Sequence, residues 1–384
     1  MACPTVALLI ETARGYGRGL LQGVAQYSRL RGPWAFELAP GDLRQTVPKI
    51  HGRVAGFIAR VATAEIGRAI LEANVPTILV GLDPQIAQRV PGLEKFSNIS
   101  SDSAGAARMA AAHLLEKKFR YYAFVGTGGR IWSKRREAAF RETIEQAGFQ
   151  AFAYPSPGAR SNQHAQQRLA DWLVRLPKPL GLMASNDSRG QEVLSACRIA
   201  GICVPEDVAV IGVDNDELFC ELSEPPLTSV ALNCVHAGYR AAELLDQLMK
   251  GRSRRPRSFL VEPLRVVARR STDIEAITDR TVAAALQAIH RGRAESFTIK
   301  TLADNLSVSR RHLEVRFRKE VGRTLLSEIQ RTRLEHAKRI LQETDLAIDK
   351  VAEASGYSSS SYMIQVFRKQ FGMTPARFRA QYRI

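Results

Sequence analysis

Phe317-Arg-Lys-Glu-Val-Gly-Arg-Thr324 returns fifty residues later as Phe367-Arg-Lys-Gln-Phe-Gly-Met-Thr374. Upstream, Ala303 returns as Ala352 at an offset of 49 residues, so the second copy is one residue longer. The extra residue falls in a polar stretch, where Ser307-Val-Ser309 corresponds to Gly356-Tyr-Ser-Ser359. A repeat of this length predicts that two similar supersecondary units build the end of the chain.

Each copy begins with a short apolar helix, expected at Ile299–Leu306 and at Ile348–Ser355. The repeated alanine lies where two helices must approach closely. A tight turn follows, and Gly356 suits its left-handed backbone.

A second helix follows each turn. Ser309, and Ser358 or Ser359, are good N-cap residues for it. Two short helices joined by a tight turn form a helix-turn-helix, whose second helix enters the DNA major groove. The apolar residues expected to bury the second helices are Leu313, Phe317 and Val321 in the first copy, and Met363, Val366 or Phe367, and Phe371 in the second.

The two copies are joined by a long predicted helix at Thr324–Gln342. Arg333 falls in the middle of its apolar stripe, which suggests a buried ion pair with a partner that the sequence does not name. We expect the stripe to consist of Leu326, Ile329, Ala337, Ile340 and Leu341.

The charge of the chain indicates a polyanionic partner. The sequence has 384 residues with 55 Lys and Arg against 38 Asp and Glu, a net charge of +17 and a pI near 10.0. Such an excess suits nucleic acid or an anionic membrane surface. Residues 276–384 carry 20 of the basic and 11 of the acidic residues, an excess of nine on the paired helices, which favours DNA. The sequence has no run of 18 apolar residues, so we predict no membrane span.

The first 270 residues alternate short apolar β-runs with helical patterns, which predicts parallel sheets covered by helices. About ten strands are too many for one typical sheet, so we expect two lobes. Strands are predicted at Val6–Ile10, Gly56–Arg60, Thr77–Val80, Tyr122–Gly126, Gly181–Ala184 and Val208–Val213, with a last pair around Pro263. Helices are predicted near Arg18–Arg31, Ala64–Ala73, Ser103–Lys117, Arg135–Ala147, Asn162–Leu176, Ser188–Ala200 and Val235–Lys250.

Polar residues follow several of these strands, at the sheet edge where ligands bind in such folds. Arginine, amide and carboxylate groups together satisfy the hydroxyls of a sugar, and Trp132 can stack on its apolar face. Asp102, Asp187 and Asp214 equally suit helix N-caps. The glycines Gly15, Gly17 and Gly19 do not satisfy a nucleotide-binding GxGxxG pattern. The candidate ligand residues are Glu11, Arg14, Tyr16, Asp102, Trp132, Arg136, Asn186, Asp187 and Asp214.

The first part of the chain resembles the LacI-type, periplasmic-binding-protein-like sensor. The resemblance implies two lobes that close over a small ligand, with Asp102, Arg136, Asn186, Asp187 and Asp214 in the cleft. That family usually begins with a helix-turn-helix, which we do not expect ahead of a first strand at Thr5. The stretches that carry the resemblance are Arg136-Glu-Ala-Ala-Phe140, Ala184-Ser-Asn-Asp187 and Val204–Asn215.

Residues 276–384 resemble the DNA-binding domain of the arabinose-operon activator (AraC/XylS) family, on the repeat, Thr374-Pro375 and Phe378-Arg379. Arg suits guanine, Glu suits cytosine and Gln suits adenine in the major groove. The implied base-facing residues are Arg311, Glu314 and Val315 in the first copy, and Ser360, Ser361, Ile364 and Gln365 in the second. The residues expected to meet phosphates or solvent are Arg310, Arg316, Arg318, Lys319, Arg368 and Lys369.

A LacI-like sensor followed by a double helix-turn-helix is the order of the xylose-operon regulators, which the chain resembles throughout. The resemblance implies a sugar-responsive transcription regulator, an activator that binds double-stranded promoter DNA and D-xylose or a related monosaccharide. It also implies a homodimer with a contact to RNA polymerase, no cofactor and no membrane partner.

The rivals are a cytosolic or periplasmic sugar-binding protein without gene regulation and a sugar-metabolising enzyme. The N-terminus lacks the basic and apolar regions of a signal peptide, so we expect a cytoplasmic protein. GxSxG, HExxH and P-loop signatures are absent, so we expect no enzyme. The five cysteines have no ligand spacing, so we expect neither zinc nor disulfides.

The expected domains are an α/β two-lobed sensor and an all-α domain with two helix-turn-helix units. We place the sensor at residues 1–272, a linker at 273–279 and the DNA-binding domain at 280–384. Within the last domain, the helix-turn-helix units lie at about 299–320 and 348–371, and the linker helix at about 324–342.

Overall fold

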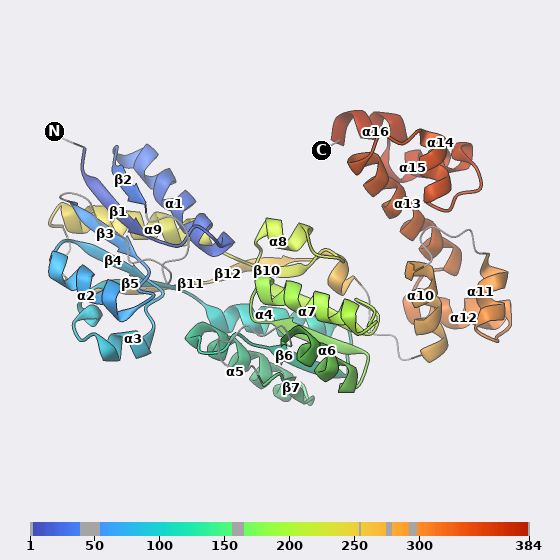
Figure 1. Ribbon diagram of the computed structural model, residues 1–384, viewed down its shortest axis with the longest axis horizontal. Helices are drawn as coiled ribbons and strands as arrows, with labels where there is room; N and C mark the ends of the chain where they lie inside the picture. The colour runs from blue at the N-terminus through green and yellow to red at the C-terminus, as the bar shows by residue number, and fades with distance from the viewer. Residues whose placement is uncertain are drawn as a thin grey trace. The chain divides into compact units, whose positions relative to one another are not determined.

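The computed structural model describes residues 3–38, 54–155, 165–252, 255–273, 279–291 and 298–382. The chain divides into two compact units, Met1–Asp273 and Ile274–Ile384 (Figure 1). Residues 162–164 of one expected helix and 274–278 of the expected linker lie outside the described residues.

The described part of the first unit contains two six-stranded sheets, one in each lobe, as the alternating pattern predicted. Every strand pair of the first sheet is parallel, and in the second only β12 runs antiparallel to its neighbour. The first sheet has the order β11(Ser258–Val261), β5(Ser97–Ser101), β4(Thr77–Val80), β3(Gly56–Ala59), β1(Thr5–Leu9), β2(Ala35–Leu38). The second has the order β12(Pro263–Val267), β10(Thr228–Leu232), β9(Val208–Asp214), β8(Leu180–Ala184), β6(Tyr121–Val125), β7(Ala151–Ala153).

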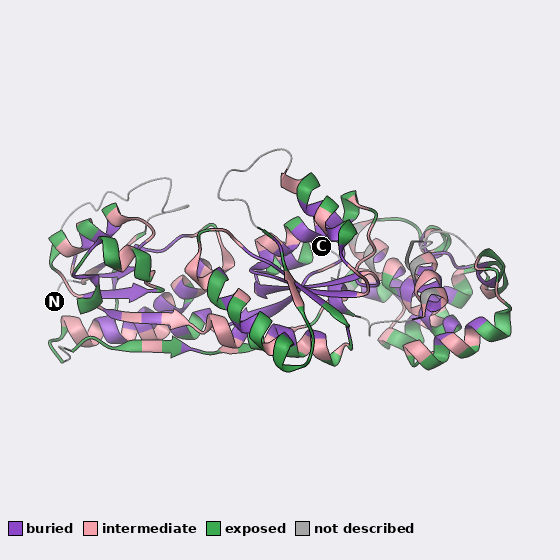
Figure 2. Cartoon of the chain, turned by 90° about the horizontal axis from the view of Figure 1, so that it is seen from below, coloured by how far each residue is buried: buried purple, intermediate pink, exposed green. Residues whose placement is uncertain are grey.

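Helices cover both faces of the sheets, so most strands are buried while the helices keep exposed outer faces (Figure 2). This burial explains why the strands are nearly continuous apolar runs. The first lobe holds α1(Gly15–Arg31), α2(Ala64–Ala73), α3(Pro84–Arg89) and α9(Cys234–Met249), with the 3-10 turn η1(Leu93–Lys95). The second holds α4(Ser103–Glu116), α5(Ile131–Gln146), α6(Ala165–Arg175), α7(Asp187–Ile199) and α8(Glu217–Glu221), with the 3-10 turn η2(Arg270–Thr272).

The chain crosses between the lobes three times in the described residues, from β5 to α4, from β10 to α9 and from β11 to β12. Each lobe is therefore built from separate pieces of sequence, and the carboxyl ends of both sheets border the space between the lobes.

The described elements of the second unit are all helices. Ser309 and Ser359 accept hydrogen bonds from the backbone N–H groups of His312 and Tyr362. This confirms Ser309 as an N-cap and selects Ser359 over Ser358 for the second unit. Gly356 adopts a left-handed φ of 76°, as its turn requires. The helices are α10(Arg280–Arg291), α11(Ile299–Asn305), α12(Arg310–Val321), α13(Leu325–Glu343), α14(Ile348–Ala354), α15(Ser360–Phe371) and α16(Pro375–Tyr382).

The linker helix α13 differs from its predicted stripe. Leu326 is 53% exposed and Leu325 is buried in its place, because the helix begins at Leu325 behind the cap Thr324. Its buried acid is Glu328, at 0% exposure, which pairs with Arg323 and, at 2.8 Å, with Arg331. Arg333 is half-buried, and burial lowers its pKa. Its expected ion pair stays a prediction.

Other differences concern short or edge elements. The strands β2 and β7 have four and three residues, too short to stand out in an apolar pattern. The helix α5 begins at Ile131, one turn earlier than expected, so Trp132 lies on a helix and not in a loop. Val321 is only half-buried at the end of α12. None of the described helices combines the length and the apolar character that a membrane crossing requires.

The closest packing in the first lobe joins α1 to α9 through glycines. A Cβ atom on Gly238 would lie 1.9 Å from the carbonyl oxygen of Leu20, and one on Gly23 would lie 2.0 Å from that of Val235. Because backbone cannot rotate away as a side chain can, only glycine allows this approach.

Gly238→Ala should therefore destabilise the sensor unit by about 1–3 kcal/mol, since the two helices must separate. Urea unfolding followed by tryptophan fluorescence measures this, because the three tryptophans, Trp34, Trp132 and Trp172, all lie in the first unit. Gly67→Ala is the control, because its Cβ would meet only the movable ends of side chains, at 3.2 Å or more. Equal effects of both changes would contradict this explanation.

Candidate functional site

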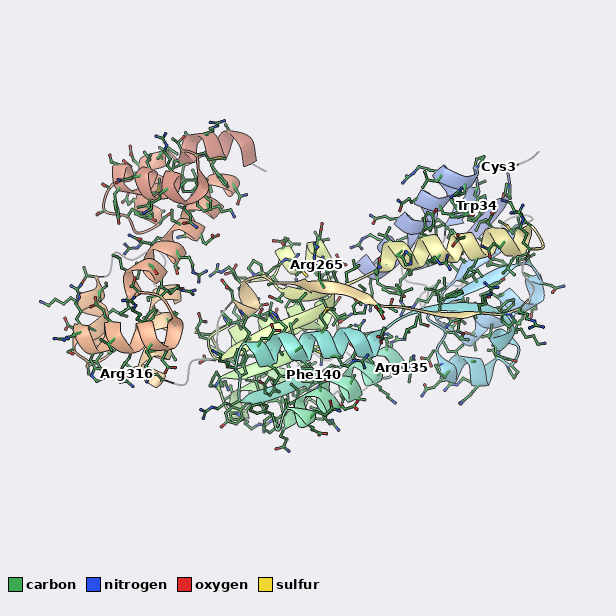
Figure 3. All side chains as sticks on the ribbon, turned by 180° about the vertical axis from the view of Figure 1, so that it is seen from behind. Cys3, Trp34, Arg135, Phe140, Arg265 and Arg316 are labelled. Carbon is green, nitrogen blue, oxygen red and sulfur yellow. The ribbon has the colours of Figure 1, made fainter. Side chains whose placement is uncertain are left out.

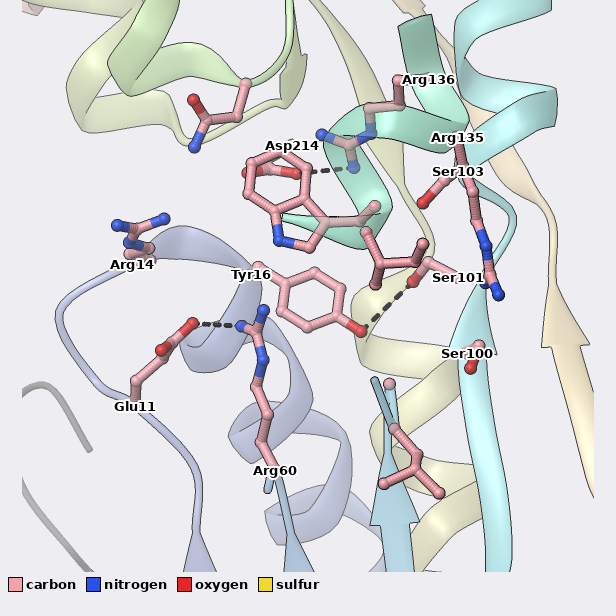
Figure 4. A pocket seen from close by; sticks show the side chains of 15 residues that line it. Glu11, Arg14, Tyr16, Arg60, Ser100, Ser101, Ser103, Arg135, Arg136 and Asp214 are labelled. Atoms are coloured by element: carbon pink, nitrogen blue, oxygen red, sulfur yellow. Dashed lines mark hydrogen bonds and ion pairs between the residues drawn. The ribbon is translucent and has the colours of Figure 1, made fainter. Parts of the chain in front are cut away.

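A pocket lies between the carboxyl ends of the two sheets (Figure 4). Both lobes contribute to it. Seven of the nine residues predicted from the sequence line it: Glu11, Arg14, Tyr16, Trp132, Arg136, Asn186 and Asp214.

The wall from the first lobe is an ion pair with a stacked phenol. Glu11 follows β1 and pairs with Arg60, which follows β3. The Arg60 guanidinium lies 5.5 Å from the centre of the Tyr16 ring, and the Ser101 hydroxyl donates to the Tyr16 oxygen at 3.4 Å. Burial raises the pKa of Tyr16, although Arg60 partly opposes this, so the phenol is neutral and can both donate and accept.

The wall from the second lobe is organised by Arg136 on α5. Its guanidinium donates to the Ser185 carbonyl oxygen and lies 3.4 Å from an Asp214 carboxylate oxygen. It also stacks on Trp132, at 5.0 Å from the ring centre. Its Nε is buried, and no hydrogen-bond partner reaches it among the described residues. Burial raises the pKa of Asp214, and the charge of Arg136 lowers it in part.

These walls offer several donors and acceptors beside two aromatic rings. Buried polar groups need hydrogen-bond partners. A small polyhydroxylated ligand can supply them, because each hydroxyl both donates and accepts, and its ring can lie against an aromatic face. The pocket is therefore suited to a monosaccharide.

Two predicted ligand residues do not line the pocket. Asp102 caps α4 by accepting from the Gly105 N–H at 2.8 Å, and it lies 3.6 Å from Arg108. Asp187 is buried beneath the pocket and accepts from the Asp216 N–H at 2.7 Å and the Ser229 hydroxyl at 2.5 Å. Burial and the charge of Asp214 raise its pKa. Asn186 caps α7 through the Arg189 N–H and also lines the pocket.

The sequence reasoning missed several lining residues. Arg60 and Gly81 directly follow β3 and β4, so the rule that ligands meet strand ends could have found them. Arg135 lies beside Arg136 on α5, at the junction of the lobes (Figure 3). The same rule applies to Leu82, two residues after β4, and to Ser100, Ser101 and Ser103 at the end of β5. Ile131, at the start of α5, has no such signal.

The second candidate site is the pair of second helices in the helix-turn-helix units. On α12, Arg311 is exposed, Val315 is 62% exposed, and Arg310 pairs with Glu314 at 3.0 Å along the outer face. On α15, Ser361, Gln365 and Lys369 are exposed, whereas Ser360 is half-buried and Ile364 packs partly against the core. The exposed faces therefore present charged, polar and apolar groups to a partner.

Arg316, one of the residues expected at phosphates, has an internal partner. Its Nε lies 2.5 Å from Asp279, whose carboxylate also accepts from the N–H groups of Thr281 and Val282 at the start of α10. Burial raises the pKa of Asp279, but the Arg316 and backbone hydrogen bonds lower it more, so its pKa lies below the usual value. Arg316 thus joins α12 to α10 inside the second unit.

Comparisons with known proteins match both units of the chain. A periplasmic binding protein-like domain model matches residues 111–272, and a helix-turn-helix domain model matches residues 302–381. The chain is 33% identical to the xylose operon regulatory protein of Escherichia coli K12 over 97% of this chain and 96% of that protein. It is 32% identical to that of Haemophilus influenzae over 97% of each.

Solved structures extend the likeness. The structure of the xylose-binding transcription activator xylR has a TM-score of 0.81 and 32% identity, over 100% of both chains. The cellobiose complex of the transcriptional regulator CelR has a TM-score of 0.56 and 26% identity, over 70% of this chain and 84% of that one.

Replacing Arg316 should affect stability. Arg316→Gln should destabilise the second unit by about 0.5–1 kcal/mol, because a partly exposed ion pair is lost. The depressed pKa of Asp279 means that this stabilisation is present above the ordinary Asp pKa of about 3.9 and fades as the pH falls through the lowered value. The difference between the proteins should therefore shrink in acid.

Urea unfolding of the full chain, followed by far-UV circular dichroism at pH 7 and pH 3, measures this change. Arg318→Gln, an exposed arginine on the same helix, is the control and should leave stability unchanged. Identical unfolding curves for Arg316→Gln and the wild type would contradict the assignment.

Proposed function

The chain belongs to the family of xylose operon regulatory proteins, and from that premise we propose that D-xylose or a closely related monosaccharide is its effector. It is a sugar-responsive, DNA-binding transcription regulator with a sensor of the LacI type and a DNA-binding domain of the AraC type. The observation that carries the effector proposal is the pocket at the sheet ends, with its ion pairs and aromatic rings.

In the proposed site, Arg136, Asn186, Glu11 and Asp214 bind sugar hydroxyls and Trp132 lies against the sugar ring. A sugar that contacts both walls favours the closed arrangement of the lobes. It can shift DNA occupancy only by its different affinity for the open and closed arrangements.

We also propose that the protein acts as a homodimer and as an activator. Two copies would place four helix-turn-helix units along a promoter, and activation would require a contact with RNA polymerase. The xylR protein, whose structure resembles this chain, is a transcription activator, and this supports activation as the role proposed here. A sugar-binding protein without gene regulation is less favoured, because it would not use the helix-turn-helix domain.

A panel of monosaccharides tests the effector. The free energy of unfolding should rise with D-xylose by RT ln(1+[L]/Kd), about 2.7 kcal/mol at a hundredfold excess over Kd. Thermal denaturation with D-xylose, L-arabinose, D-ribose and D-glucose ranks the sugars. If none of them stabilises the protein, the proposal is wrong.

Arg136→Gln should weaken sugar binding at least about tenfold, because the buried charge that pairs with Asp214 is lost. Arg135→Gln is the matched control, because Arg135 is exposed at the edge of the pocket and should contribute little. Isothermal titration with the best sugar gives both affinities. An unchanged Kd for Arg136→Gln would remove this residue from the site.

Base reading by α12 has its own test. Arg311→Ala should weaken DNA binding by about 1–3 kcal/mol and relax the preference at one base pair. Lys369→Ala should instead weaken binding to all DNA sequences equally and reduce the salt dependence of binding by about one released ion. Fluorescence anisotropy with a panel of single-base operator variants separates the two outcomes. Uniform weakening by both changes would contradict the assignment of Arg311.

A further inference from the structure

The turn Asp214-Asn215-Asp216, between β9 and α8, has an unusual backbone. Asp214 has a φ of 113° and Asn215 a φ of 50°, so two consecutive residues other than glycine lie in the left-handed region. Such conformations persist only where surrounding contacts hold them. The turn is therefore an element whose backbone depends on its neighbours.

The two aspartates of the turn contact different lobes. Asp214 lines the sugar pocket and faces Arg136 at 3.4 Å, a long distance for an ion-pair hydrogen bond. Asp216 accepts from the Gly15 N–H at 2.6 Å and from Arg18 at 2.8 Å, both at the start of α1 in the first lobe. A ligand that binds Asp214 thus contacts a turn that is also hydrogen-bonded to the first lobe.

The turn is also held from beneath within the second lobe. Asp187 accepts from the Asp216 N–H, and the Ser229 hydroxyl accepts from the Asn215 N–H at 3.0 Å while donating to Asp187. Two of these three bonds are buried, and together they hold the turn against α7 and β10. The turn has a further contact near the end of the sensor unit.

That contact is Arg269, which follows β12 four residues before the sensor unit ends at Asp273. Its Nη1 donates to the Asn215 side-chain oxygen at 2.9 Å and to the Leu227 carbonyl at 3.1 Å. Its Nε pairs with the exposed Glu221 at 2.7 Å, and the Arg269 side chain is 12% exposed.

The segment from Arg269 to Ser271 is hydrogen-bonded to the second sheet. The Arg269 N–H donates to the Thr228 hydroxyl at 2.8 Å, and the buried Ser271 donates to the Val210 carbonyl at 2.6 Å. This segment is the last described part of the sensor before the chain enters the DNA-binding domain.

We infer that Arg269 is the positioning residue that couples sugar occupancy to DNA binding, through its hydrogen bond to Asn215. Sugar at Asp214 and closure at Asp216 both act on the turn, and Arg269 passes the resulting change to the segment that leads into the DNA-binding domain. This inference rests on the proposed sugar response. It predicts a residue that touches neither sugar nor DNA and still determines the response.

The experiment compares the ratio of DNA Kd values without and with sugar. A labelled duplex from upstream of the chain's own gene and D-xylose are the probes, with the full-length protein. Arg269→Gln and Asn215→Gly remove the same hydrogen bond from its two ends, and glycine keeps the left-handed backbone. Glu221→Gln is the control, because it removes only the exposed partner of Arg269.

We expect a wild-type ratio that differs from one by at least about fivefold, the lower end of typical coupling. Arg269→Gln, Asn215→Gly and the double variant should all bring the ratio to within about twofold of one. The D-xylose Kd without DNA, measured by isothermal titration, should stay within about threefold of the wild-type value. Glu221→Gln should keep the wild-type ratio.

Three outcomes would overturn the inference alone. The first is a wild-type ratio of DNA Kd values in Arg269→Gln, and the second is a loss of D-xylose binding in that variant that is as large as its loss of response. The third is a loss of response in Glu221→Gln as large as that in Arg269→Gln. A ratio of one in the wild-type chain would instead overturn the proposed sugar response, and the inference with it. The two failures are therefore distinguished by the protein in which they occur.

Discussion

The sensor depends on the pairing of two buried charges, Arg136 on α5 and Asp214 at the end of β9. Both side chains are nearly excluded from water, and an unpaired charge in that position would be strongly destabilising. The pair is loose at 3.4 Å, and the Arg136 Nε remains unsatisfied among the described residues. A ligand that completes these hydrogen bonds therefore gains more than it would from a fully satisfied surface.

The same constraint explains the surroundings of the pair. Asp187 lies close to Asp214, and burial beside a like charge raises its pKa, so its hydrogen bonds from Ser229 and the Asp216 N–H are needed to hold it in place. Those bonds support the left-handed turn from Asp214 to Asp216. The pocket, the contact between the lobes and the segment before the DNA-binding domain thus meet at one turn.

The DNA-binding domain uses part of its basic charge for its own stability. Arg316 pairs with Asp279, and Arg323 and Arg331 pair with the buried Glu328. Other basic residues of α12 and α15, among them Arg311 and Lys369, are exposed on the surface of the domain. The count of 55 Lys and Arg residues therefore overstates the number of cations that a nucleic acid can meet.

The sequence alone determined the local features of this protein. The fifty-residue repeat, the cap Ser309, the left-handed Gly356 and most strand ends follow from patterns within one or two turns of chain, because local periodicity decides which face is buried. Only the tertiary structure decided which charges meet. Glu11 pairs with Arg60, Asp216 with Arg18 and Asn215 with Arg269, across 49 to 198 residues of sequence. Such partners depend on how three crossings between the lobes bring strand ends together, and that arrangement leaves no local signal in the chain.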